Sequence, residues 1–237
     1  MKTYKILPKN NNIDFAGRLI ADPTVNEAKT RCTFALIRNF GGEKAPVILS
    51  FTMFLKDALP EWMKKGAAVV AHAFFNPDVY TNKDGKKVYR HEIVVKTVEQ
   101  AELKDKILPG INDIAFSGRV VNDPVINEAG TCAMFKLIRN FGGDKEPVVI
   151  DLTWLRRSSD PAFPEWLKKG VPVTAHAFVN PAVYTDKDGN EVKKTQFVVK
   201  KAEQAELIEK TYADNEPAPA EAEKEGVVDV DVDIQEI

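Results

Sequence analysis

Stretches in which apolar and polar residues alternate recur along most of the chain, separated by turn-forming residues. The clearest lie at 31–40 and 132–141, and both end in Asn-Phe-Gly-Gly. Alternation places the apolar side chains on one face of a strand, so each stretch predicts a β-strand. Asp-Gly at 84–85 and at 188–189 predicts two hairpin tips. Further apolar runs predict strands at 13–19, 47–54, 68–75, 88–95, 114–121, 148–155 and 192–199.

Two segments break this pattern. Residues 60–65 and 164–169 begin with Pro-Glu-Trp and are followed by Gly66 and Gly170. Proline and glutamate suit a first helical turn, and glycine suits a helix end, so each segment predicts a short helix. We expect Trp62 and Trp166 in these helices to pack in the core. The predicted order is three strands, a helix and a two-stranded hairpin, and it occurs twice.

The chain is a tandem repeat. Leu-Ile-Arg-Asn-Phe-Gly-Gly occupies 36–42 and 137–143, an offset of 101 residues. Beyond the third strand the offset becomes 104, because the second copy carries three extra residues near 156–161. A unit this long exceeds the roughly 20–50 residues of solenoid repeats and indicates a duplicated domain. We expect a first copy at 1–107, a second copy at 108–210 and a tail at 211–237.

The order of elements in each copy is that of an OB-fold, a five-stranded Greek-key barrel. The predicted class is therefore all-β, with one short helix per domain and two tandem OB-fold barrels. The tail is rich in Pro, Ala and Glu, which predicts disorder. Its last residues alternate valine with aspartate, and two interpretations stay open: a strand that adds to a partner's sheet edge, or a solvated, self-repelling segment.

Charge is distributed unevenly. The net charge of the whole chain is −2, but residues 1–110 carry +6, residues 111–210 carry 0 and residues 211–237 carry −8. The first copy is thus the basic part, and the tail is strongly acidic. An uneven distribution of this kind favours an anionic ligand for the folded part and makes the overall pI a poor guide.

Several function classes find no support in the sequence. The N-terminus has no apolar signal-peptide core, and no stretch is long enough to span a bilayer, so we expect a cytoplasmic protein without membrane contact. Cys32 and Cys132 occupy different repeat positions and are expected to be reduced thiols. His72, His91 and His176 lack metal-ligand company. Because no phosphate loop or nucleophile motif occurs, we expect no enzymatic activity, no cofactor and no metal.

The order and spacing of several short motifs resemble bacterial single-stranded DNA-binding proteins. Residues 12–25 resemble the opening strand of that family, which ends in Asp-Pro-x-Val, and 63–66 resemble its Leu-Arg/Lys-Lys-Gly. Residues 80–85 resemble its aromatic hairpin, and 92–95 its closing strand. The second copy repeats these motifs, so the chain resembles the tandem variants of the family. The resemblance implies single-stranded DNA as ligand and a homodimer with four barrels.

The tail departs from the family pattern. The family's acidic tail usually ends in Pro-Phe, which docks replication and repair proteins, whereas this chain ends in Ile-Gln-Glu-Ile. Docking of such a protein on the acidic tail is therefore an expectation without its usual motif.

Sequence-tolerant binding of single strands needs cations along a groove and aromatic faces for the bases. Aromatic candidates are the tyrosines before the hairpin tips, the phenylalanines after the second strands and one tryptophan: Tyr80, Tyr184, Phe40, Phe141 and Trp154, the last with a core role as the open alternative. Basic candidates in the first copy, which carries most of the cations, are Arg18, Arg38, Lys44, Lys83, Lys86, Lys87 and Arg90. Those in the second copy are Arg119, Arg139, Lys145 and Lys187. Arg31, Lys193 and Lys194 are further candidates, and a salt bridge inside the barrel is the alternative for Arg38 and Arg139.

Two functions are compatible with this sequence. The first is sequence-tolerant binding of single-stranded DNA in replication, recombination or repair, with RNA as an alternative strand. The second is a protein-interaction or assembly module that kept the barrels but binds nucleic acid weakly or not at all. The neutral charge of the second copy and the missing Pro-Phe motivate the second function.

Overall fold

The computed structural model describes residues 2–42, 44–83, 85–141, 145–157, 159–185 and 189–212, without the side chains of Lys2, Tyr184, Thr185 and Lys193. The first copy contains β2 (Asn11–Leu19), β3 (Thr24–Val25), β4 (Arg31–Arg38), β5 (Val47–Phe54), β6 (Ala68–Thr81) and β7 (Lys87–Gln100). The second contains β8 (Asn112–Val120), β9 (Val125–Ile126), β10 (Cys132–Arg139), β11 (Val148–Leu155), β12 (Pro172–Thr185) and β13 (Glu191–Gln204). The end strands are β1 (Lys2–Ile6) and β14 (Ile208–Tyr212).

Each copy forms a closed barrel with the predicted strand order. In the first copy β2 pairs with both β6 and β4, and β5 pairs in parallel with β7, which completes the ring. Closure brings β2 so near β4 that a Cβ atom on Gly17 would lie 2.9 Å from Leu36 Cβ. Gly118 meets Leu137 and the carbonyl of Ile138 in the same way. Glycine at this repeat position therefore permits the close approach of the two strands.

The prediction of a short helix in each copy is wrong. Residues 60–66 form successive turns instead, in which Met63 N–H donates to the Pro60 carbonyl at 3.0 Å. Gly66 already adopts the left-handed conformation with φ 86°, so the segment ends before an i to i+4 hydrogen bond can form. The segment still plugs the barrel, because Met63 is buried and Trp62 packs against the core. The second copy repeats this arrangement with buried Leu167 and half-buried Trp166.

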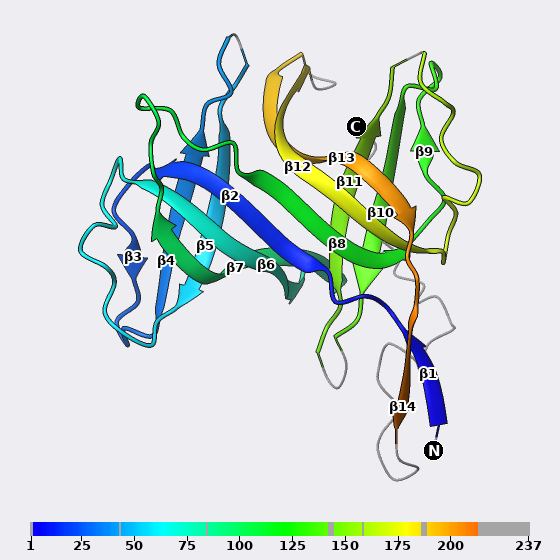
Figure 1. Cartoon of the computed structure of the whole chain (residues 1–237), viewed down its shortest axis with the longest axis horizontal. Coiled ribbons are helices and arrows are strands. Elements are labelled where there is room, and N and C mark those ends of the chain that lie inside the picture. Colours follow the sequence, from blue (N-terminus) through cyan, green and yellow to red (C-terminus); the bar gives the residue numbers. More distant parts are fainter. Residues whose placement is uncertain are drawn as a thin grey trace.

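The two barrels share one sheet and one core. β2 and β8 run antiparallel side by side in the middle of the molecule (Figure 1), paired from Asn11↔Phe116 to Phe15↔Asn112. Phe75 of the first copy is fully buried and contacts Phe116 and Phe197 of the second, with ring centroids 5.7 and 5.4 Å apart. The buried residues of both copies accordingly form one cluster.

Two arginines lock the copies together reciprocally. Arg38 Nη1 donates to the carbonyls of Pro109 and Ile111, which precede β8, and to Ala16 in its own barrel. Arg139 donates in the same way to Pro8, Asn10 and Ser117. Each guanidinium thus holds the entry segment of the other copy.

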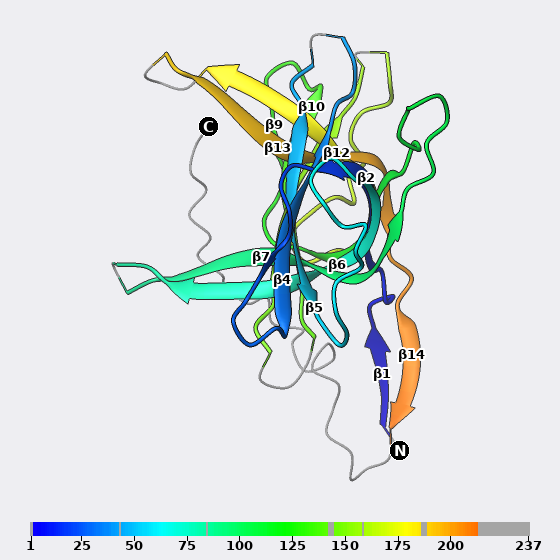
Figure 2. The ribbon, with the colours of Figure 1, turned by 90° about the vertical axis from the view of Figure 1, so that its left-hand side faces the viewer.

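Each long hairpin continues past its own barrel as an arm. We call residues 74–94 the first arm and 178–198 the second arm; both project to the same side of the molecule (Figure 2). Asn11 supports the first arm where β6 leaves β2, because its side chain bonds both the N–H and the carbonyl of Phe75 at 2.9 Å. Asn112 does the same for Val179 in the second arm.

One face of each arm packs on the opposite barrel. In the first arm, His91 Nδ1 donates to the Val149 carbonyl at 3.2 Å and Lys87 pairs with Glu146. Burial lowers the pKa of His91. Thr195 of the second arm reaches the Ile48 carbonyl. The other face of each arm is turned toward the barrel from which the arm extends.

The first and last described strands pair in a ribbon that has a counterpart in the linker. β1 pairs with β14 from Lys2↔Tyr212 to Ile6↔Ile208. At the same repeat positions, Lys104 bridges Ile107 through a two-residue turn whose residues, Asp105 and Lys106, have φ of 51° and 65°. The sequence Lys-Ile-Leu-Pro at 5–8 and 106–109 marks the equivalence. The ribbon and the linker turn are therefore the long and short versions of one feature.

Cys32 and Cys132 are both free thiols, as expected, and burial raises the pKa of each. The described part of the chain contains no helix that is long and apolar enough to cross a membrane.

Candidate nucleic-acid interface

The free face of the first arm carries an exposed aromatic ring with a cation stacked on it. Tyr80 is 40% exposed, and the guanidinium carbon of Arg90 lies 4.7 Å from its ring centroid. Asp78 lies opposite Arg90 in the strand pair. A planar guanidinium over an aromatic ring keeps both groups oriented while leaving the second ring face open. This pair therefore offers a stacking surface and a positive charge together.

A polar network joins this face to the barrel wall. Arg31 at the start of β4 donates to Glu92 Oε2 at 3.0 Å and to Thr52 at 3.2 Å. Asn76 Nδ2 donates to the other oxygen of Glu92 at 2.9 Å. The network fixes the base of the first arm against β4 and β5. It also places the guanidinium of Arg31, paired with Glu92, where the first arm meets its own barrel.

The second copy lacks this network, because its key positions hold different residues. Arg31 is replaced by Cys132, Glu92 by Gln196 and Asp78 by Ala182 at the equivalent repeat positions. Its barrel wall instead exposes Val125, Met134 and Leu155, which are 48%, 38% and 48% accessible. The two copies thus share a fold but differ at particular positions of this face: Val125 and Met134 stand where the first copy has Thr24 and Thr33, while both copies expose an apolar residue at the end of the third long strand, Phe54 and Leu155.

The other candidates fall into three groups. Exposed cations that remain accessible are Lys44, Lys83, Lys86, Lys87 and Lys145, of which Lys87 is paired with Glu146. Arginines bound to backbone carbonyls are Arg18, Arg38, Arg119 and Arg139. Half-buried aromatics packed against the core are Phe40, Phe141 and Trp154.

Arg139 is only 4% exposed, so it is not part of the accessible surface. Arg38 and Arg139 also lie over the rings of Phe40 and Phe141, each 5.7 Å from the centroid, so these phenylalanine rings already have a cation against them. Trp154 meets Phe163 edge to face at 5.7 Å. Lys187 and the side chain of Tyr184 lie outside the described residues.

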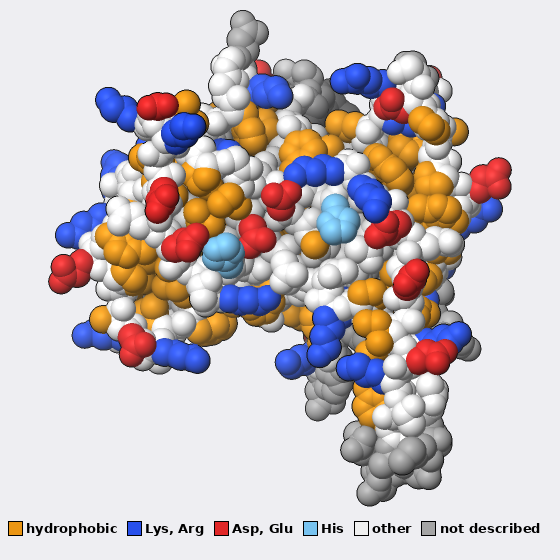
Figure 3. Space-filling model, viewed as in Figure 1, with side chains coloured by type: hydrophobic (Ala, Val, Ile, Leu, Met, Phe, Trp, Pro, Cys, Tyr) orange, Lys and Arg blue, Asp and Glu red, His pale blue; other side chains and the backbone are white. Residues whose placement is uncertain are grey.

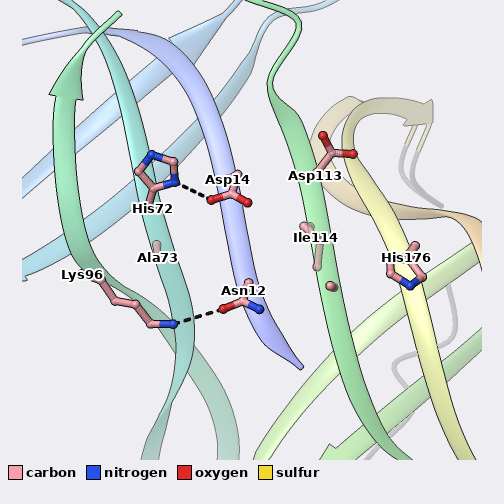
Figure 4. Close-up of a pocket in the computed structure, with 9 residues that line it drawn as sticks. Asn12, Asp14, His72, Ala73, Lys96, Asp113, Ile114 and His176 are labelled. Atoms are coloured by element: carbon pink, nitrogen blue, oxygen red, sulfur yellow. Dashed lines mark hydrogen bonds and ion pairs between the residues drawn. The ribbon is translucent and has the colours of Figure 1, made fainter. Parts of the chain in front are cut away.

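The outer face of the shared sheet is a different kind of surface. It carries acidic and basic side chains intermixed around two histidines (Figure 3) and contains a hollow of about 340 Å³. Within it, His72 Nδ1 donates to Asp14 at 2.6 Å and Lys96 donates to Asn12 at 3.1 Å (Figure 4). No group of three metal-ligating side chains that could hold an ion is found among the described residues. Mixed charge makes this face a poor track for a phosphate chain.

Solved structures resemble this chain over both barrels, which meet at the β2–β8 pairing, here called the seam. The chain has the tandem OB fold of a single-stranded DNA binding protein from Thermus aquaticus. The wild-type structure of that protein aligns with a TM-score of 0.55 and 16% identity, covering 89% of this chain and 96% of the other. A deletion mutant of the same protein aligns with a TM-score of 0.56 and 16% identity, covering 87% and 98%.

No family model and no curated protein matches the sequence. The match with the Thermus aquaticus structures covers both barrels, so it supports the tandem fold rather than a single domain. At this identity the likeness concerns the fold alone.

Sequence reasoning missed two features of the surface. Glu92 was assigned only to a strand, although it anchors Arg31. Lys106 is absent from the basic candidates, because it lies outside both predicted barrels. The repeated Lys-Ile-Leu-Pro would have indicated that each copy begins several residues earlier than its first long strand.

Proposed function

We propose that this protein binds single-stranded DNA without sequence preference and without catalysis. The observation that carries the proposal is the exposed Tyr80 ring with Arg90 stacked on it, on an arm of a tandem OB fold. Stacking on an aromatic face tolerates any base, and the cations of the first copy supply the attraction for phosphates. The arm, the Arg31–Glu92 network and the exposed lysines would form one groove in the first copy.

A titration of labelled oligo-dT by fluorescence anisotropy at low and high salt tests this function. Neutralising phosphates releases counterions, so we expect tight binding whose logarithm falls steeply with the logarithm of salt concentration. Parallel titrations with oligo-rU and duplex DNA determine which strand is preferred. No measurable binding of any strand at low salt would refute the proposal.

The second candidate function, a protein-interaction module, is favoured by one observation. Val125 and Met134 expose apolar surface on the second barrel, where the first barrel has Thr24 and Thr33. Under this alternative the chain would bind no strand at low salt.

The cellular compartment, the cellular process and the domain bounds belong to the same proposal. We place the protein in the cytoplasm, in replication, recombination or repair, and divide the chain into 1–107, 108–210 and 211–237. β14, which begins in the second unit and continues two residues past 210, pairs with β1 of the first, so these units are joined at the ribbon as well as at the β2–β8 pairing.

We expect the first copy to contribute more affinity than the second. Arg90 and Lys194 occupy the same repeat position, and both are exposed. Arg90→Ala should weaken oligo-dT binding by several-fold and reduce its salt slope, because it removes both a cation and the ring partner of Tyr80. Lys194→Ala, the matched control, should change binding less. Equal losses in the two variants would contradict this asymmetry.

We also expect the acidic tail to compete with DNA. Residues 213–237 lie outside the described residues, but they carry the tail's whole charge of −8 and are tethered to a first copy of +6. A tethered anion has a high effective concentration and is screened by salt. Deleting 213–237 should tighten oligo-dT binding at low salt and leave the melting temperature unchanged. Identical binding by the full and shortened chains would leave docking of a replication or repair protein as the tail's role.

Finally, we propose a homodimer that brings four barrels together. The outer face of the shared sheet carries both charge signs, so cations of one chain can meet anions of a second chain across a two-fold axis. Light scattering should give twice the 26.4 kDa mass of one chain at micromolar concentration. A mass of 26.4 kDa under those conditions would show a monomer.

A further inference from the structure

A cationic hollow of about 260 Å³ lies between the first barrel and the linker. Its lining includes Arg18 at the end of β2, Arg38 and Asn39 at the end of β4, and Lys106 in the linker turn. No carboxylate is among the described residues that line it. Three cations that share a hollow without an anion repel one another, and a bound anion would relieve that repulsion.

Both guanidinium groups are already fixed. Arg18 donates to the carbonyls of Gly66 at 3.1 Å and Lys106 at 3.4 Å. Arg38 donates from Nη1 to three carbonyls, while its Nη2 has no hydrogen-bond acceptor among the described residues. Partial burial lowers the pKa of Arg38, a sign that its charge is poorly solvated. A poorly solvated, preoriented guanidinium gains more from an anion than a free surface lysine does.

The second copy provides an internal contrast. Beside the second barrel, the places of Lys106 and Leu108 are taken by Lys5 and Leu7 of the N-terminal segment, which lie in or next to the β1–β14 ribbon. There Leu7 is buried and Lys5 pairs with Glu209 at 3.8 Å. In the first copy the short turn leaves Ile107, the counterpart of a buried isoleucine, 69% exposed. The ribbon therefore covers this position beside the second barrel, and the linker turn leaves it open beside the first barrel.

We propose that the hollow binds a phosphate group, held by Arg18, Arg38 and Lys106. Resting on the proposed function, we assign that group to the backbone of a single strand that passes along the linker between the copies. Planar guanidinium groups match the geometry of phosphate oxygens, and Lys106 adds a mobile point charge. The site is one-sided, because the ribbon occupies the equivalent place in the second copy.

The first test uses inorganic phosphate and the full chain. Lys106→Gln removes an exposed ammonium and should leave the fold intact, and Lys5→Gln is the matched control at the same repeat position. In ¹⁵N NMR titrations we expect saturable shifts of the Asn39, Lys106 and Ile107 amides in the wild type and in Lys5→Gln. The apparent affinity should fall several-fold in Lys106→Gln. Equal titration of all three proteins, or no saturable shift in the wild type, would overturn the site.

The second test uses oligo-dT and distinguishes the strand from free phosphate. Loss of one phosphate contact should lower the salt slope by about 0.7 in Lys106→Gln and leave it unchanged in Lys5→Gln. Saturable phosphate shifts without any oligo-dT binding would retain the site and refute the proposed function. Tight oligo-dT binding with an unchanged slope in Lys106→Gln would retain the function and refute the strand's passage through the hollow.

Discussion

Replacing Tyr80 by alanine should weaken binding of oligo-dT by about 1–3 kcal/mol, the cost of one lost base stack. The ring is 40% exposed and projects from the first arm, where its described partner is the guanidinium of Arg90 rather than the core. Because little apolar area is buried there, the melting temperature of Tyr80→Ala should stay near that of the wild type. Anisotropy titration and thermal unfolding of the same preparation measure both quantities.

Tyr80→Phe provides the control for this substitution, because it keeps the ring and removes only the hydroxyl. We expect Tyr80→Phe to bind within about twofold of the wild type if stacking carries the contribution. A marked drop in melting temperature for Tyr80→Ala would identify Tyr80 as a structural residue instead. A loss in Tyr80→Phe as large as in Tyr80→Ala would assign the effect to the hydroxyl.

Replacing Phe75 by alanine should lower the free energy of unfolding by about 3–5 kcal/mol, the usual cost of emptying a buried phenylalanine site. Phe75 is fully buried and lies edge to face with Phe116, Phe197 and His91. Since two of these rings belong to the second copy, the cavity would open at the seam. We expect one cooperative unfolding transition at lower denaturant concentration, measured by tryptophan fluorescence and far-ultraviolet circular dichroism.

The repeat supplies the control for Phe75. Its counterpart in the second copy is Val179, which is also fully buried. Val179→Ala removes less volume and should cost less than Phe75→Ala. Two separated transitions in Phe75→Ala would indicate that the copies unfold independently, and a loss below that of Val179→Ala would show that the aromatic cluster adds no stability.

The repeat, the strands and the OB-fold class were accessible from the sequence because they depend on local patterns. Alternation sets which face of a strand is buried, and residues 31–40 show it without any tertiary information. The helix prediction failed at 60–66 for a tertiary reason. Met63 must enter the end of the barrel, and the left-handed Gly66 ends the segment before a full helical turn.

The candidate site was less accessible. Arg38 and Arg139 each precede an Asn-Phe-Gly-Gly loop, a position that favours exposure. Their carbonyl partners come from segments 71 and 131 residues away in the chain, Pro109 and Pro8, and no local pattern reveals such distant contacts. Tyr80 can be proposed from the sequence because a hairpin tip is a local signal. Glu92 was missed because its partner Arg31 lies 61 residues away.

Because the ribbon and the linker turn are equivalent, the two barrels could be connected through either of two like places. Ile6 and Ile208 pair where Ile107 and Lys104 pair in the other half, and a two-residue turn suffices to join the latter. A circular permutant that begins at Lys106, ends at Asp105 and joins Ile208 to Ile6 through such a turn would keep every strand of both barrels. In that molecule the hollow beside the linker would lie at the chain ends, and the covered position would become the connection.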